Sequence, residues 1–280
     1  MTSSTPEWMR PNPDAIARAS TVDLHTDRPH TARIYDFVLG GKDNFPADRA
    51  AAEGMLAEWP SLRVAMRENR KFMHRVTRYL VEEAGIRQFL DVGTGIPTSP
   101  NLHEIAQAVA PESRVVYVDN DPIVLAHARA LLTSTDEGAT AYLDADMRNP
   151  AAIMESAEVA ATLDLTRPIA LSVIAVIQFV PDEVAYDLVA RLLEPLPSGS
   201  YLALSAVTTD TDPGAARVVA QYNARGIFMQ ARTKAQTAKF FEGLELVDPG
   251  VQLVQHWRPD DTPTTADNES GVYAGLARKP

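Results

Sequence analysis

Short apolar runs alternate with amphipathic stretches along most of the chain, from about residue 89 to the C-terminus. The apolar runs predict strands, and the stretches between them repeat apolar residues at the three-to-four-residue spacing of a helix. The predicted strands are 89–92, 114–118, 139–143, 169–176, 201–207, part of 244–254 and 272–278, and the predicted helices are 60–83, 101–109, 122–132, 150–161 and 182–193.

Alternation of strands and helices is typical of a parallel sheet covered by helices on both faces. The last two predicted strands are joined instead by a loop rich in Pro, Asp and Thr, which predicts an antiparallel C-terminal strand. We therefore expect an α/β fold with residues 86–280 as the sheet domain. Residues 31–85 are predicted to form a helical cap or lid, and residues 1–30, which lack a hydrophobic period, a mobile tail.

Composition narrows the class of protein. The chain has 280 residues, 45% of them hydrophobic, which is enough for a sizeable core. It has no cysteine, which excludes disulfides, thiolate metal sites and a cysteine nucleophile. A net charge of −11 argues against general nucleic-acid binding, because phosphates would be repelled. No apolar stretch has the length of a signal peptide or membrane span, so we expect a cytoplasmic protein, and nothing indicates a particular oligomeric state.

The most informative segment ends the first predicted strand, where an apolar run stops at Asp91 and breaks into Gly93-Thr94-Gly95. Glycines let the main chain bend sharply and approach a ligand closely. Asp119 ends the next predicted strand, about 20 residues further on, where a ribose-binding acid is expected. Because the ends of parallel strands meet in one crevice, this pattern predicts a ligand that contains a nucleoside. The alternative is a tight turn that only joins strand to helix.

The same segment departs from the dinucleotide fingerprint, because Thr98 stands where that pattern has a third small residue. Asp91-x-Gly93-x-Gly95 followed by Asp119 resembles the first two motifs of class I S-adenosylmethionine-dependent methyltransferases, which have a Rossmann-like fold. The resemblance implies that the glycine turn faces the amino acid end of the cofactor and that Asp119 binds the ribose. The remaining residues expected to line this cofactor site are Thr94, Asn120, Asp146, Met147 and Ser172. S-adenosylmethionine, or S-adenosylhomocysteine as bound product, is therefore the expected ligand.

A second resemblance lies upstream. Residues 32–45, Ala-Arg-Ile-Tyr-Asp-Phe-Val-Leu-Gly-Gly-Lys-Asp-Asn-Phe, look like the signature of an actinobacterial methyltransferase-like family long classed as a domain of unknown function. Together with the later motifs, the resemblance spans roughly residues 30 to 280. It implies a lid over the cofactor, to which Arg33, Tyr35, Asn44 and Phe45 contribute contacts. The alternative is that Gly40-Gly41 simply connects two helices and that the aromatic residues pack.

The sequence thus predicts a methyltransferase that acts on a small-molecule acceptor. The candidates for catalysis are Tyr35, Asp36 and Gln178, although relatives are expected to carry His at the last position, so Gln178 lacks the usual acid–base group. No metal site is predicted, because His103-Glu104 is not followed by the second histidine of a zinc-protease helix. The open alternatives are a non-catalytic, regulatory cofactor-binding protein and an NAD-dependent oxidoreductase.

Basic residues recur at helical spacing within 60–83, opposite an apolar face. We interpret them as a solvated helix face, and the alternative is a docking surface for an acidic substrate or partner. The residues are Arg63, Arg67, Arg70, Lys71, Arg75 and Arg78.

Overall fold

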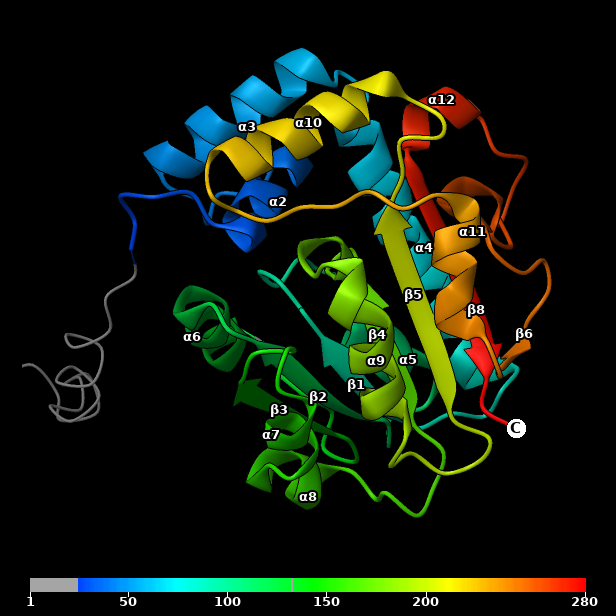
Figure 1. The fold of residues 1–280 in the computed structure, drawn as a ribbon. Helices are drawn as coiled ribbons and strands as arrows, with labels where there is room; N and C mark the ends of the chain where they lie inside the picture. The colour runs from blue at the N-terminus through cyan, green and yellow to red at the C-terminus, as the bar shows by residue number, and fades with distance from the viewer. Residues whose placement is uncertain (1–24, 132) are drawn as a thin grey trace, which may run out of the picture.

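The computed structural model describes residues 25–131 and 133–280, so the part of the predicted tail before residue 25 lies outside the described residues. One eight-stranded sheet runs through the molecule with helices on both faces (Figure 1). The elements are α2 (Thr31–Leu39), α3 (Pro46–Glu58), α4 (Leu62–Glu82), β1 (Gln88–Val92), α5 (Leu102–Val109), β2 (Arg114–Asp119), α6 (Pro122–Leu131), β3 (Ala139–Asp144), α7 (Pro150–Met154), α8 (Ala157–Thr162), β4 (Ala170–Ile174), η2 (Ile177–Phe179), α9 (Asp182–Leu193), β5 (Tyr201–Val207), α10 (Pro213–Ala224), α11 (Lys234–Ala238), η3 (Lys239–Phe241), β6 (Glu245–Leu246), β7 (Gln252–Leu253), η4 (Val254–His256), α12 (Asp267–Ser270) and β8 (Val272–Arg278).

The strand order confirms the predicted sheet. Strands follow the order β3-β2-β1-β4-β5-β8-β6, with β7 also paired to β8. The pairs among β1 to β5 are parallel, whereas β8 runs antiparallel to β5, β6 and β7. The carboxyl ends of five neighbouring parallel strands therefore meet at one edge, where ligands bind in open α/β sheets.

Several elements differ from the prediction in extent. The helix predicted over 150–161 is two helices, because the Ser156 side chain accepts the Val159 N–H and caps a new one. The strand predicted over 169–176 ends at Ile174, since Ala175 takes a left-handed φ of 56° and the chain enters η2. Helix α10 was not predicted, and α12 interrupts the connection that the sequence pattern left without a helix.

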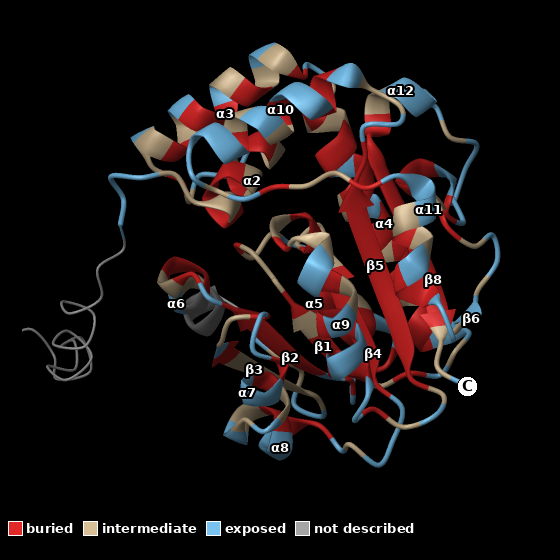
Figure 2. Cartoon of the chain, viewed as in Figure 1, coloured by how far each residue is buried: buried red, intermediate tan, exposed pale blue. Residues whose placement is uncertain are grey.

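Alternate strand residues divide the core between the two faces of the sheet. Phe89, Val115 and Tyr117 pack with α4 and α5 on one face, whereas Leu90 and Val116 pack toward α7, α8 and α9 on the other. Strand β5 is buried along its whole length because both of its faces are covered (Figure 2). This accounts for the nearly unbroken apolar sequence of the central strands.

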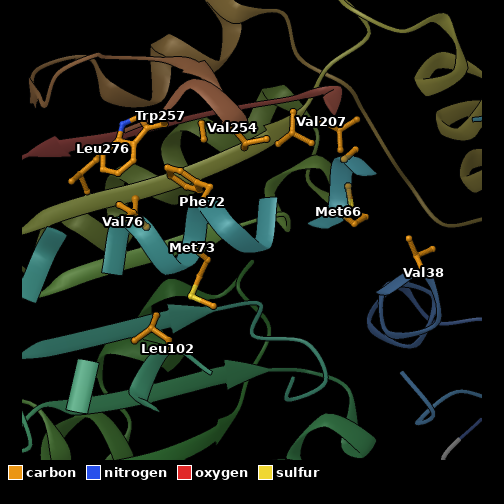
Figure 3. Close-up of a cluster of buried hydrophobic side chains, with 14 of the residues drawn as sticks. Val38, Met66, Phe72, Met73, Val76, Leu102, Val207, Val254, Trp257 and Leu276 are labelled. Atoms are coloured by element: carbon orange, nitrogen blue, oxygen red, sulfur yellow. The ribbon is translucent and has the colours of Figure 1, made fainter. Parts of the chain in front are cut away.

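Helix α4 packs against the sheet layer as well as against the cap helices α2 and α3. It lies along α5 and packs against β8 and η4. Phe72 of α4 packs edge to face on Trp257, with the two ring centroids 5.3 Å apart (Figure 3). The basic side of α4 is not a uniformly solvated face, contrary to our interpretation. Arg75 is buried and donates to the carbonyls of Val254 (2.6 Å) and Trp257 (2.9 Å), whereas Arg78 pairs with the exposed Asp260.

The cap over the carboxyl ends of the strands consists of α2, α3 and α10, which come from distant parts of the chain (Figure 1). Trp59 ends α3 and is fully buried. A Cβ at Gly271 would lie 2.4 Å from the Trp59 ring, and one at Gly214, in the first turn of α10, would lie 2.9 Å from it. Both positions need glycine, because the Trp59 ring packs directly on their backbone. Trp59 thereby packs the end of α3 against α10 and the start of β8.

Candidate functional site

A cavity of about 550 Å³ lies where the carboxyl ends of the strands meet the cap. Its wall has three parts: the turns after β1, β2 and β3, the segment from Ile174 to Val180 after β4, and the inner side of the cap with α4. A volume of this size is typical of small-molecule sites. The cavity brings together most of the residues that the sequence predicted at the strand ends.

The glycine turn is fixed against β2 and the segment after β4. The Gly93 N–H donates to the Val118 carbonyl at 2.8 Å, and Gly93 and Gly95 have positive φ values of 77° and 68°. A Cβ at Gly93 would lie 2.4 Å from Cγ2 of Val176. Only glycine therefore allows this turn and leaves the backbone of Thr94 and Gly95 in the cavity wall.

Asp119 lies at the end of β2 with its carboxylate in the cavity wall. Its Oδ2 accepts the Gly95 N–H at 2.8 Å, and its Oδ1 accepts the Asp121 N–H at 2.9 Å. Burial raises the pKa of Asp119 from its ordinary value, while these two N–H groups oppose that rise. Each oxygen retains lone pairs, so the carboxylate is oriented and can still accept hydrogen bonds from ribose hydroxyls. The residues present thus fit a nucleoside ligand.

Asp91 and Arg70 place opposite charges on the cavity wall. Burial raises the pKa of Asp91 to about 6, although Ser172 and Arg70 lower it. Ser172 is the register partner of Asp91 on β4 and is buried behind it, outside the wall. Arg70 donates to the carbonyls of Thr98 and Pro100, and burial lowers its pKa. Arg70 is therefore a site residue, which the interpretation of α4 as a solvated basic face missed.

The turn after β3 contributes Asp146 and Met147 to the wall. Asp146 is engaged by the side chain of Arg148, whose Nε lies 2.9 Å from Oδ2, and this contact lowers the pKa of Asp146. Met147 is buried, and Asn120, after β2, is exposed at the rim of the cavity. These positions lie beside Asp119, on the strand-end side of the cavity.

The N-terminal signature is divided between the cavity and a hydrogen-bonded turn. Tyr35 lines the cavity, where its hydroxyl donates to the Met66 carbonyl and accepts from Asn69 Nδ2 at 3.2 Å. Burial raises the pKa of Tyr35, so the hydroxyl stays protonated. The Asp36 carboxylate instead accepts from Asn44 Nδ2 at 2.7 Å and faces the Gly41 turn. Asp36 and Asn44 therefore brace the connection between α2 and α3 and do not line the cavity.

Arg33 and Phe45 also lie outside the cavity wall. The Arg33 guanidinium lies over the Phe45 ring at 5.5 Å and pairs with the buried Asp48. The Phe45 N–H donates to the Asp48 carboxylate at 2.9 Å and so helps to start α3. Of the signature residues predicted to contact the cofactor, only Tyr35 lines the cavity, and it does so together with residues just before it in the chain.

Those preceding residues were not predicted. Pro29, His30, Thr31 and Ala32 line the cavity, and His30 Nδ1 lies 2.8 Å from Asp121 in the turn after β2. The His30 N–H also donates to Asp48, which ties this segment to the start of α3. Residues 25–30 were predicted to belong to a mobile tail, yet His30 is tied both to the cap and to the sheet domain.

Gln178 lies on η2 in the cavity wall and is 4% exposed. Its Nε2 donates to the Ala175 carbonyl at 2.7 Å, whereas Oε1 is buried without a partner among the described residues. An amide has no useful basicity at neutral pH. Gln178 can therefore accept a hydrogen bond from a ligand but cannot remove its proton.

In the described part of the chain, no helix is long and apolar enough to cross a membrane. Within the same residues, no group of three or more histidine or acidic side chains could hold a metal ion.

Comparisons with known proteins agree with the geometry. A family described as S-adenosyl methyltransferase matches residues 17–280, while no curated protein matches the chain. A DUF574 family protein from Streptomyces avermitilis is similar at 56% identity and a TM-score of 0.90, covering 92% of this chain and 100% of its own. A candidate methyltransferase from Thermobifida fusca is similar at 38% identity and a TM-score of 0.85, covering 91% and 97% of the two chains.

A more distant structure shows the fold alone. Magnesium protoporphyrin IX methyltransferase from Synechocystis, with bound S-adenosylhomocysteine, has 14% identity and a TM-score of 0.52, covering 95% of this chain and 100% of its own. The mostly parallel sheet with antiparallel C-terminal strands is the class I methyltransferase fold.

Proposed function

Because the chain belongs to the S-adenosyl methyltransferase family, we propose that its cavity holds the cofactor across the ends of β1 to β3, with the acceptor on the cap side. The protein is an S-adenosylmethionine-dependent methyltransferase, and S-adenosylhomocysteine is its cofactor product. This family assignment favours the predicted methyltransferase over an NAD-dependent oxidoreductase. When bound, the cofactor supplies a methyl group activated on a sulfonium.

The observation that carries this placement is the arrangement of Asp119, Asp91 and Arg70 around one cavity. The oriented Asp119 carboxylate suits two vicinal ribose hydroxyls. The amino acid end of the cofactor is a zwitterion, and Asp91 and Arg70 offer one charge of each sign. Asp91 would hold the ammonium and Arg70 the carboxylate, because buried charges are favourable only when paired.

The chemistry asked of the chain's own residues is mainly positioning. Methyl transfer from a sulfonium needs the nucleophile, methyl carbon and sulfur in line and water excluded. Among the predicted catalytic candidates, Asp36 lies outside the cavity, Tyr35 is held protonated, and Gln178 is an amide. None of the three supplies a general base in the cavity. Tyr35 and Gln178, which line the cavity, would hold the acceptor and close the site, whereas Asp36 braces the connection between α2 and α3.

The acceptor is proposed to be a small molecule that the protein meets in the cytoplasm. The cavity between the cap and the strand ends has a volume of about 550 Å³, which is typical of small-molecule sites. A net charge of −11 also disfavours general nucleic-acid binding.

Calorimetry with S-adenosylhomocysteine tests the cofactor placement. We expect micromolar affinity for the wild type, roughly −8 kcal/mol. Asp119→Ala and Arg70→Met should each weaken binding by about 1.5 to 3 kcal/mol, because each removes charge-assisted hydrogen bonds. Arg78→Met is the matched control, since Arg78 lies on the same helix but pairs with the exposed Asp260. Wild-type affinity in both site variants would contradict the placement.

A further inference from the structure

The cap side of the cavity differs in chemistry from the strand-end side. The strand ends present the charged residues Asp91, Asp119, Asp146 and Arg148. The cap, the first turns of α4 and the segment after α10 contribute apolar and aromatic side chains instead. They include Val38, Trp59, Leu62, Met66, Tyr222 and Phe228. One cavity therefore joins a polar compartment, which suits the cofactor, to an apolar compartment.

No charged side chain from α2, α3, α10 or residues 226–229 lines the cavity, within the part of the chain that the structure describes. Helix α4 contributes one charged residue to the wall, Arg70, which the proposed function assigns to the carboxylate of the cofactor. His30, just before α2, is turned to Asp121 at 2.8 Å. A charged acceptor on this side would thus lose its hydration without gaining an ion pair, which is unfavourable in an apolar site. Aromatic rings from Phe179, Tyr222 and Phe228 instead offer surfaces for a flat apolar molecule.

Several polar atoms interrupt this apolar wall, among them Trp59 Nε1, Gln178 Oε1 and the Tyr222 hydroxyl. Gln178 Oε1 is buried without a partner, and its orientation is fixed because Nε2 is committed to the Ala175 carbonyl. The Tyr222 hydroxyl makes no hydrogen bond with the described residues, and burial raises its pKa, so it remains protonated. A buried acceptor without a partner is costly, and a ligand that donates to it removes the cost.

Gln178 is also held rigidly. The backbone carbonyl of Gln178 accepts the Gln230 N–H at 2.8 Å. The buried Arg232 donates to the carbonyls on either side, Ile177 at 2.8 Å and Val180 at 2.6 Å, and pairs with Asp182. Polar groups that are fixed in this way discriminate between ligands, because they cannot turn toward a different partner.

We infer that the acceptor is an uncharged, planar aromatic molecule that donates one O–H or N–H hydrogen bond to Gln178 Oε1. The inference rests on the proposed function, because it takes the apolar compartment as the acceptor side. Gln178 is then a specificity-determining residue that recognises a donor on the acceptor, while the uncharged wall around it disfavours ions.

Four naphthalene probes of similar size test this inference in protein saturated with S-adenosylhomocysteine. They are 2-naphthol (neutral donor), 2-methoxynaphthalene (neutral, no donor), 2-naphthoate (anion) and 2-naphthylmethylammonium (cation). Titration calorimetry should show 2-naphthol binding at least about tenfold more tightly than each of the others, the effect of one buried hydrogen bond. Equal or tighter binding of the anion or the cation would overturn the inference, as would binding of none of the four.

Variants of Gln178 assign the selectivity to this residue. Gln178→Met should abolish the preference for 2-naphthol over its methyl ether, and Gln178→Glu should shift the preference toward the cation, because it adds a carboxylate. An unchanged naphthol-to-ether ratio in Gln178→Met would overturn the role of Gln178. Should that variant not fold, an unchanged cation-to-naphthol ratio in Gln178→Glu would overturn it. Failure of the wild type to bind S-adenosylhomocysteine would instead refute the proposed function, so the two failures are distinct.

Discussion

Replacing Asp91 by Asn should stabilise the ligand-free protein at neutral pH and weaken cofactor binding at the same time. Burial raises the pKa of Asp91 from 3.8 to about 6, which means that the fold disfavours the ionised carboxylate. That rise in pKa corresponds to roughly 3 kcal/mol if the charge is not screened by water. Because Asp91 is only half-buried and faces the cavity, water screens the charge, and we expect about 1 to 2 kcal/mol.

The direction of the stability change follows from the protonation state of Asp91 at each pH. Below about pH 4 the Asp91 carboxyl is neutral in both the folded and the unfolded chain, so its burial does not lower the free energy of unfolding. Between about pH 4 and 6 the folded chain retains that proton while the unfolded chain loses it. Above about pH 6 the carboxyl is ionised in both states, and the free energy of unfolding is lowered by the full cost of burying the carboxylate. The amide of Asn has nearly the same shape and never ionises, so it removes this cost.

Urea denaturation at several pH values measures the effect. The free energy of unfolding of Asp91→Asn should exceed that of the wild type by about 1 to 2 kcal/mol at pH 7, and the difference should shrink as the pH falls toward 4. Affinity for S-adenosylhomocysteine should be lower in the variant at pH 7, because the ammonium loses its partner. A variant that is less stable at pH 7, or a stability difference that does not change with pH, would refute this account of Asp91.

Three further substitutions separate residues that shape the site from residues that only brace it. Gly93→Ala should lose about 2 to 4 kcal/mol of stability, because its Cβ would clash with Val176. The control Gly85→Ala, also at positive φ but with open space around its Cβ, should lose about 1 kcal/mol. Equal losses in urea denaturation would argue against the close approach of Val176 to Gly93. Arg75→Met should lower the free energy of unfolding by about 1 to 3 kcal/mol, because two buried carbonyls lose their donor. Urea denaturation measures this loss with Arg78→Met as the control, and equal losses in the two variants would contradict the prediction. Asn44→Ala should lower the melting temperature, because Asp36 loses a partner, while S-adenosylhomocysteine affinity measured by calorimetry changes less than about threefold; a large loss of affinity at unchanged melting temperature would return Asn44 to the cofactor site.

The strand-end residues could be predicted because their positions follow from topology. Once Asp91 and Asp119 end neighbouring parallel strands, the sheet itself brings them to one crevice. The glycines between them carry a backbone requirement that a sequence displays directly. The fold class followed from the same alternation of strands and helices.

Residues on helices were harder to place, because helical spacing does not say what packs against a given turn. Arg70, Arg75 and Arg78 recur on one basic stripe, yet one lines the cavity, one binds buried carbonyls and one reaches solvent. Similarly, the polar side chains of Asp36 and Asn44 bind each other, which a dense polar motif cannot distinguish from ligand contacts.

The apolar compartment gave no sequence signal at all. Trp59, Met66 and Tyr222 line the cavity, but as residue types they are indistinguishable from ordinary core residues. Their place depends on the packing of α10 against α3, a contact between distant segments that local periodicity does not report.

A crystal structure with S-adenosylhomocysteine tests the central claim most directly. The account predicts the ligand in the cavity at the ends of β1 to β3, with its ribose hydroxyls within hydrogen-bond distance of Asp119 and its amino acid end between Asp91 and Arg70. A ligand bound elsewhere, or one whose ribose lies beyond contact with Asp119, would contradict it.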